Sequence, residues 1–231
     1  MKRTLLLLGL YSLLSPVATK AQITSVTGDA TVVSPPASVL TGTGTGTESL
    51  VFVEQENVVL TSPLAVDATL PFSYGDNGTL HPLTPGTIAA GTDITSVYLH
   101  SFFAPNTSGT VYSGSITFST PILGVEALDA SLVATNSLLG SPTTTYYTFS
   151  DSQGFELDTN IDQFTISGDT LTYTDETFTA PDDLRILVAG TAIPATTPEP
   201  TSLWLMGTGL VALVGAGALK RKVFTATRRR T

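Results

Sequence analysis

The chain has 231 residues, a formal net charge of −9 and no cysteine. Residues 22–197 contain 18 acidic residues and a single cation, Arg185, which gives this stretch a net charge of −17. Such a segment cannot neutralise phosphates, so nucleic-acid binding is excluded and phosphorylated substrates are disfavoured. Without cysteine there are no disulfides, thiol catalysis or zinc–thiolate sites. The fold must therefore be stabilised by its core.

The first 21 residues have the layout of a secretory signal peptide. Lys2 and Arg3 precede an apolar run over residues 5–14, and small residues follow Pro16. Ten apolar residues are too few to span a bilayer stably. We therefore expect export through the Sec translocon, with cleavage between Ala21 and Gln22.

Residues 22–48 are rich in Thr, Ser and Gly, and include the run TGTGTGT at 41–47. This composition predicts a flexible segment ahead of the folded domain. The run lacks both GxGxxG and a following Gly-Lys-Ser/Thr, so it is not a phosphate loop.

From residue 49 to residue 194, short β-rich runs alternate with turn residues, which predicts an all-β sandwich or jelly-roll-like domain. VYLHSFF (97–103) has bulky residues on both faces and predicts a central strand. The hairpin signal is clearest in DQFTISGDTLTYTD (162–175), where Gly168 and Asp169 mark the turn. A helix is expected only around residues 125–139. The other expected elements are strands in LVFVEQENVVL (50–60), SGSITFST (113–120), TTYYTF (144–149) and DLRILVAG (183–190), and a tight turn in YGDNGTL (74–80).

For most polar residues of this domain that could take part in catalysis or metal binding, the sequence favours a structural role. His100 alternates with Tyr98 and Phe102, so we expect a packed or hydrogen-bonded histidine, and His81 precedes Pro82 in a turn. Two histidines without HExxH spacing do not predict a zinc site, and there is no G-x-S-x-G elbow for a serine hydrolase. Arg185 follows two aspartates, Asp182 and Asp183. We expect a local ion pair of Arg185 with these aspartates, which as a surface pair would contribute ~0–1 kcal/mol.

An acidic run, DSQGFELDTNID (151–162), offers Asp151, Glu156 and Asp158 as candidate calcium ligands. The alternative is a solvated acidic loop, since the spacing is not that of an EF-hand. A glycosidase carboxylate pair is disfavoured, because the only Trp, Trp204, lies outside the domain and cannot stack a sugar. No other cofactor is expected.

The C-terminal part has a transmembrane pattern. Residues 201–219 are 19 uncharged positions, close to the ~20 needed to span the hydrocarbon core. Lys220, Arg221 and Lys222 follow at once and should stay on the cytoplasmic side. Just before the helix, Pro198 and Pro200 favour an extended backbone, which suits either a spacer or a segment held in the groove of a processing enzyme.

The stretch TPEPTSLWLMGTGLVALVGAGALKRK resembles the C-terminal sorting signal of bacterial PEP-CTERM proteins, with triplet, helix and basic cluster in order. The resemblance implies recognition by an exosortase, a membrane-embedded cysteine transpeptidase, near Pro198, Glu199 and Pro200. It also implies removal of the helix and transfer to the cell surface or extracellular polymer. The tail at 223–231 departs from the pattern. More loosely, VYLHSFFAP, GSITFSTPILGV, ISGDTLTY and DDLRILVAG resemble an exported β-domain often found ahead of this signal.

These observations predict four parts: a signal peptide (1–21), a flexible segment (22–48), a β-domain (49–194) and a sorting signal (195–231). We expect a non-catalytic structural or adhesive protein of the cell surface or extracellular matrix, inner-membrane anchored before processing. The alternatives are a polysaccharide-binding module that is calcium-dependent or not, and a secreted hydrolase.

Overall fold

The computed structural model describes residues 21–40, 48–69, 72–74, 83–102, 109–148, 154–155, 161–177 and 180–190. The chain separates into two compact units, Met1–Ala192 and Ile193–Thr231, and all described residues belong to the first. This unit is mostly β, with one α-helix in the described ranges. The prediction of a β-rich body is therefore confirmed.

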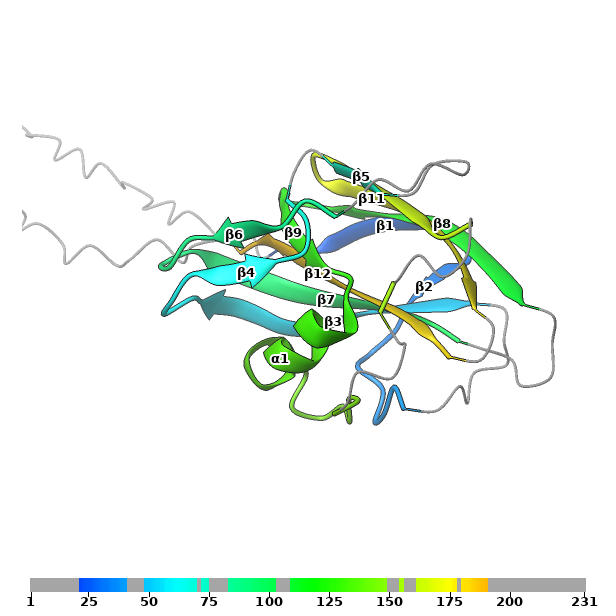
Figure 1. The fold of residues 1–231 in the computed structure, drawn as a ribbon, viewed down its shortest axis with the longest axis horizontal. Coiled ribbons are helices and arrows are strands. Elements are labelled where there is room, and N and C mark those ends of the chain that lie inside the picture. Colours follow the sequence, from blue (N-terminus) through cyan, green and yellow to red (C-terminus); the bar gives the residue numbers. More distant parts are fainter. Residues whose placement is uncertain are drawn as a thin grey trace, which may run out of the picture. The chain divides into compact units, whose positions relative to one another are not determined.

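Most strands belong to two five-stranded sheets, which Figure 1 shows as separate layers. Sheet A has the order β1 (Ile23–Gly28), β8 (Thr110–Phe118), β11 (Thr170–Thr177), β10 (Gln163–Ser167), β5 (Phe72–Tyr74). Sheet B has the order β2 (Ala30–Val32), β3 (Ser49–Val59), β7 (Asp93–Ser101), β12 (Asp182–Ala189), β9 (Ile122–Glu126). Neighbouring strands are antiparallel except β2 and β3, and β4 (Leu64–Val66) pairs with β6 (Gly86–Ile88) in a separate ribbon.

The main core lies between the two sheets. Alternation along β8 places Ile116 and Phe118 in this core, and Leu171 of β11 joins them from the next strand. Sheet B contributes Leu99 and Ile186, among others. This packing of several antiparallel sheets is consistent with a sandwich.

Sheet B is buried on both faces. All but one residue of β7, and likewise of β12, is buried, and β7 lies at the centre of the sheet as its sequence predicts. The outer face of sheet B, the one away from sheet A, is covered by α1 (Asp129–Leu139), the β4–β6 ribbon and residues 140–148. Two further apolar clusters fill these contacts, one containing Leu187 and Leu139 and the other Phe52 and Leu132.

Several sequence predictions hold because their signals are local. The β10–β11 hairpin forms with Gly168 at φ 65°, and β8 and β12 match their predicted runs. The region expected to be helical divides between β9 and α1. The predicted turn at 74–80 lies, apart from Tyr74, outside the described residues.

Two sequence predictions about the secondary structure are wrong. Residues 22–48 were expected to be flexible, but β1 and β2 lie within them as edge strands of sheets A and B, so the folded domain begins well before residue 49. Residues 144–148 form no strand, although TTYYTF predicts one; Thr145 makes a single bridge to Ser38. Side chains of this segment pack over the outer face of sheet B instead, with Tyr146 beside Tyr98.

Both ends of the body are bonded to the turn between β8 and β9. The Gln22 amide donates to Ser119 Oγ at 2.9 Å, and the Ser119 amide donates to the Gln22 carbonyl. The Ala189 amide donates to the Pro121 carbonyl at 2.9 Å. The chain therefore enters and leaves the folded body at one end of the two sheets.

Substitution by alanine should destabilise the protein more at Gly28, at the crossing from β1 to β2, than at Gly91 in another turn. Gly28 has φ +70°, and a Cβ there would lie 2.1 Å from the Ser113 carbonyl oxygen. Gly91 has φ +81°, but a Cβ there meets nothing within 4 Å. We expect Gly91→Ala to lower the free energy of unfolding by about 1–2 kcal/mol, the cost of a left-handed alanine. Gly28→Ala should cost clearly more, because the β1–β8 contact must also open. Urea denaturation measures both, and equal losses would contradict the close approach.

Candidate functional site

The most concentrated chemistry of the described residues surrounds Arg185, whose side chain has no solvent exposure. Along β12, Leu184 and Ile186 face the main core, so alternation turns Arg185 to the outer face of sheet B. Its guanidinium group holds Glu54 of β3 bidentately: Nε donates to Oε2 at 2.7 Å and Nη2 to Oε1 at 2.9 Å. This fork geometry is the strongest form of arginine–carboxylate pair.

A β-bulge brings Glu54 to the arginine. Val53 pairs with Val97 and Gln55 pairs with Ser96, so Glu54 has no partner of its own on β7. A bulge of this kind re-aims a side chain and bends its strand. Ser96 completes the contact by donating its hydroxyl to Glu54 Oε2 at 2.5 Å.

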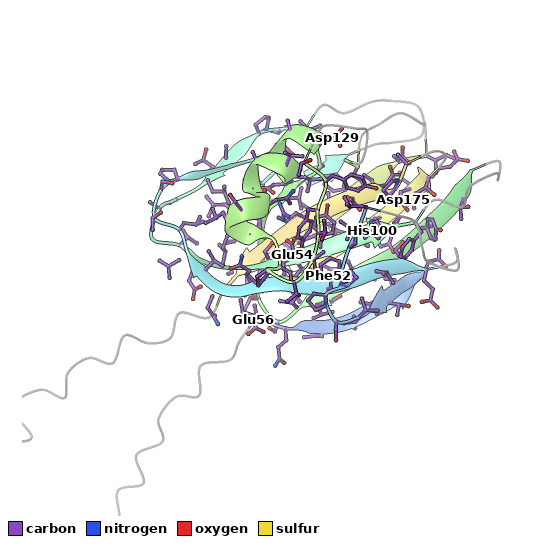
Figure 2. All side chains as sticks on the ribbon, turned by 90° about the horizontal axis from the view of Figure 1, so that it is seen from below. Phe52, Glu54, Glu56, His100, Asp129 and Asp175 are labelled. Carbon is purple, nitrogen blue, oxygen red and sulfur yellow. The ribbon has the colours of Figure 1, made fainter. Side chains whose placement is uncertain are left out.

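The remaining donors of Arg185 tie sheet B to α1. Nη1 donates to Glu126 Oε2 of β9 at 3.1 Å, to Thr135 Oγ1 at 2.5 Å and to the Leu132 carbonyl at 3.1 Å, and Nη2 donates to Asn136 Oδ1 at 2.8 Å. The rings of Tyr98 and Tyr146 lie 5.3 and 5.8 Å from the guanidinium carbon. One cation thus joins three strands, a helix and two aromatic rings. Figure 2 shows Glu54 on the side of sheet B that α1 covers.

Electrostatics make this cluster unusual. Burial raises the pKa of Glu126 to about 7, against the opposing effects of the Arg185 charge and the Thr135 hydrogen bond. Burial acts to lower the pKa of Arg185, but the charge and hydrogen bonds of Glu54 and the charge of Glu126 raise it overall, so the guanidinium stays charged. The cluster therefore holds one cation, Arg185, and two acidic side chains, Glu54 and Glu126. Of these two, Glu126 has a pKa near neutral pH.

The expected surface pair of Arg185 with Asp182 and Asp183 is wrong. Asp182 faces the opposite side of the sheet, and Asp183 is fully buried and bound elsewhere. Asp183 accepts a hydrogen bond from Tyr98 Oη at 3.0 Å and is hydrogen-bonded to His100 Nδ1 at 2.6 Å. The sequence signal for Arg185 was the position of a lone cation inside the apolar run DLRILVAG. No local sequence pattern could identify Glu54 as its partner, because the two residues lie 131 positions apart in the sequence.

His100 is packed and hydrogen-bonded, as its alternation with Tyr98 and Phe102 predicts. Its ring is 1% exposed and meets Phe102 edge-on with centroids 4.6 Å apart. The His100–Asp183 pair has the geometry of a base and the carboxylate that orients it. Within the described ranges, however, Nε2 has no hydrogen-bond partner, so no hydroxyl stands there as a nucleophile.

Other predicted site residues fall mostly outside the described residues. This holds for the candidate calcium ligands Asp151, Glu156 and Asp158, for His81, for the triplet Pro198, Glu199 and Pro200, and for the cations Lys220, Arg221 and Lys222. Of the predicted cleavage pair, Ala21 is buried in the main core and Gln22 is bonded to Ser119.

Two further findings concern only the described part of the chain. No three acidic or histidine side chains there are grouped so that they could hold a metal ion. None of the helices there has the length and hydropathy required of a membrane span.

The Arg185 cluster generates a stability prediction. Arg185→Met should lower the free energy of unfolding by about 3–5 kcal/mol, because it leaves Glu54 buried without its partner. Urea denaturation at pH 7 measures the loss. The matched control is the double variant Arg185→Met with Glu54→Leu, which removes the bidentate pair, leaves only Glu126 with its raised pKa, and should recover much of that loss. A single-variant loss below about 1 kcal/mol would indicate a solvent-screened pair instead.

Comparison with known proteins assigns the C-terminal part. Residues 196–222 match the family model described as the PEP-CTERM protein-sorting motif. A search of curated proteins and a search of solved structures each found no match. The chain therefore carries a PEP-CTERM protein-sorting motif at its C-terminus, behind a mostly β-stranded body whose activity the comparisons leave open.

Proposed function

We propose that this chain is a structural or adhesive protein of the bacterial cell surface or extracellular matrix. The observation that carries the proposal is the sorting motif at residues 196–222, since PEP-CTERM proteins are exported and sorted to the cell surface by an exosortase. Processing would occur near Pro198, Glu199 and Pro200. The transmembrane helix that the sequence predicts at 201–219, with the cations that follow it, would hold the chain in the inner membrane until then.

The body supports a role as a self-standing scaffold. Two of its buried polar groups are held by contacts within the protein: Arg185 makes six hydrogen bonds, and His100 is hydrogen-bonded to Asp183. Two buried apolar clusters outside the main core hold α1 and the ribbon in place. A body stabilised in this way needs no disulfide, which suits a cysteine-free exported protein.

The position of the chain ends also supports a tethered body. Gln22 and Ala189 are both bonded to the turn Ser119–Pro121, so the segments before and after the body are attached at one end of the sheets. Such a body can fold while either flanking segment is still held in a membrane.

Replacement of the triplet tests the sorting proposal. In Pro198→Ala/Glu199→Ala/Pro200→Ala, the full-length chain should accumulate in the inner membrane, because the exosortase loses its recognition segment. Cell fractionation and mass spectrometry of the mature C-terminus measure this, beside a strain without exosortase. Pro194→Ala, just outside the matched residues, is the control and should be processed normally. A triple variant with the same mature C-terminus and surface yield as the parent would refute the proposal.

A second candidate is calcium-dependent polysaccharide binding, favoured by the excess of 18 acids over one cation in residues 22–197 and by the run at 151–162. If it is correct, millimolar Ca²⁺ should raise the melting temperature, and Asp151→Asn/Glu156→Gln/Asp158→Asn should remove the shift. Asp169→Asn, in an exposed turn, is the control. A glycan array then tests sugar recognition with and without chelator. No shift in the parent chain would count against calcium.

A further inference from the structure

At one end of the main core, the two sheets face each other with polar side chains. From sheet B come Ser49, Ser101 and Asp182, which are direct neighbours in register across β3, β7 and β12. The Ser49 and Ser101 hydroxyls are hydrogen-bonded at 2.8 Å. From sheet A come the inward residues Tyr112, Tyr173, Asp175 and Thr177. This polar layer lies between the apolar core and the end of the body opposite to Gln22 and Ala189.

Asp175 is the most confined member of this layer. It is fully buried, and neither carboxyl oxygen has a hydrogen-bond partner of good geometry. Tyr112 pairs with it in register across β8, and Ser101 faces it from sheet B. Figure 2 labels Asp175 on its strand, apart from Glu54.

The charged groups that the described residues place around Asp175 are all negative. Asp29, from the crossing between β1 and β2, and Asp162, just before β10, both act on it electrostatically. Asp182 of β12 lies beside Ser101, and the phenols of Tyr112 and Tyr173 are uncharged near neutral pH. Among the described residues, the basic side chains Arg185 and His100 both lie on the other face of sheet B. An ionised carboxylate here would have no counter-charge from the described part of the chain, which is costly in a protein interior.

We propose that Asp175 is a buried proton-binding site, and that loss of its proton as pH rises weakens the packing of the two sheets at this end of the body. In the folded chain the neutral carboxyl group is accommodated between the sheets. The ionised group would repel Asp29 and Asp162 and draw water in. The stability of the exported body would thereby depend on the pH outside the cell.

The direction of the pKa shift follows from this geometry. Burial raises the pKa of Asp175 to about 8, the Ser101 hydroxyl lowers it in part, and the charges of Asp162 and Asp29 raise it further. Because the pKa is higher in the folded state than the unfolded value of 3.8, the folded chain retains a proton that the unfolded chain has lost. The contribution of Asp175 to stability is therefore greatest below the unfolded pKa, falls as pH rises towards 8, and is flat above it.

Glu126 contributes a change of the same sign at lower pH, between 4.5 and about 7. The fall between pH 7 and pH 8 is therefore the part that Asp175 should dominate.

The test compares Asp175→Asn with the parent chain, purified from its host, by urea denaturation from pH 5 to pH 9. Asparagine imitates the protonated carboxyl group. Stability of the parent relative to Asp175→Asn should fall with rising pH, approaching tenfold per pH unit in the unfolding constant, and level off above pH 8. Asp169→Asn, exposed in the β10–β11 turn, should leave the parent's pH profile unchanged. Glu126→Gln should remove only the contribution of Glu126, which ends near pH 7, and should leave the fall between pH 7 and pH 8 in place. Parallel profiles for Asp175→Asn and the parent would overturn the proposal.

A second measurement does not depend on the variant folding. In the parent chain labelled with ¹³C at aspartate carboxyl carbons, the resonance assigned to Asp175 should titrate between pH 7 and pH 9, and it must be assigned because burial also raises the pKa of Asp183. Titration of the Asp175 resonance below pH 6 would also overturn the proposal.

Discussion

The described body depends on one interaction, the buried salt bridge of the Arg185 guanidinium group with Glu54 and Glu126. It connects three strands of sheet B, and its remaining donors bind α1 through Thr135, Asn136 and the Leu132 carbonyl. Burial of such a group is costly, so its net gain in stability over an apolar substitute is small. Its main consequence is geometric. The helix can dock on sheet B in one register only, because any shift would leave a buried charge unpaired.

This interaction explains why sheet B can be buried on both faces. An antiparallel sheet commonly exposes one face to water and shows alternating polar residues there. Here the outer face carries Phe52, Tyr98 and Leu187, and α1 and residues 140–148 cover it. The near-continuous apolar runs of β7 and β12 follow from this double burial. Polar groups that remain on the outer face, such as Asp183 and His100, are therefore found in pairs.

Sequence reasoning succeeded where the signal was short-range. Period-two alternation located β8, the β10–β11 turn followed from Gly168, and the double-sided bulk of residues 97–103 marked a central strand. The PEP-CTERM motif is likewise a linear signal, and it was identified from its three parts alone. Composition was misleading for residues 23–32, because Thr and Ser are acceptable in edge strands as well as in flexible segments. The strand predicted for TTYYTF does not form, because its tyrosines pack against the outer face of sheet B. The partners of Arg185 depend on a bulge and on pairing over 131 residues, which no local pattern specifies.

The central interaction can be observed directly, because Arg185 is the only arginine between residues 4 and 220. In a body spanning residues 21–190 with ¹⁵N-labelled arginine, a single side-chain Nε–H signal should appear in the NMR spectrum. If the guanidinium is buried and bonded as described, this signal should persist at pH 8 and exchange with solvent slowly, on the time scale of core amides. An Nε–H that exchanges as fast as that of free arginine would contradict the buried Arg185–Glu54 pair and the docking of α1 that rests on it.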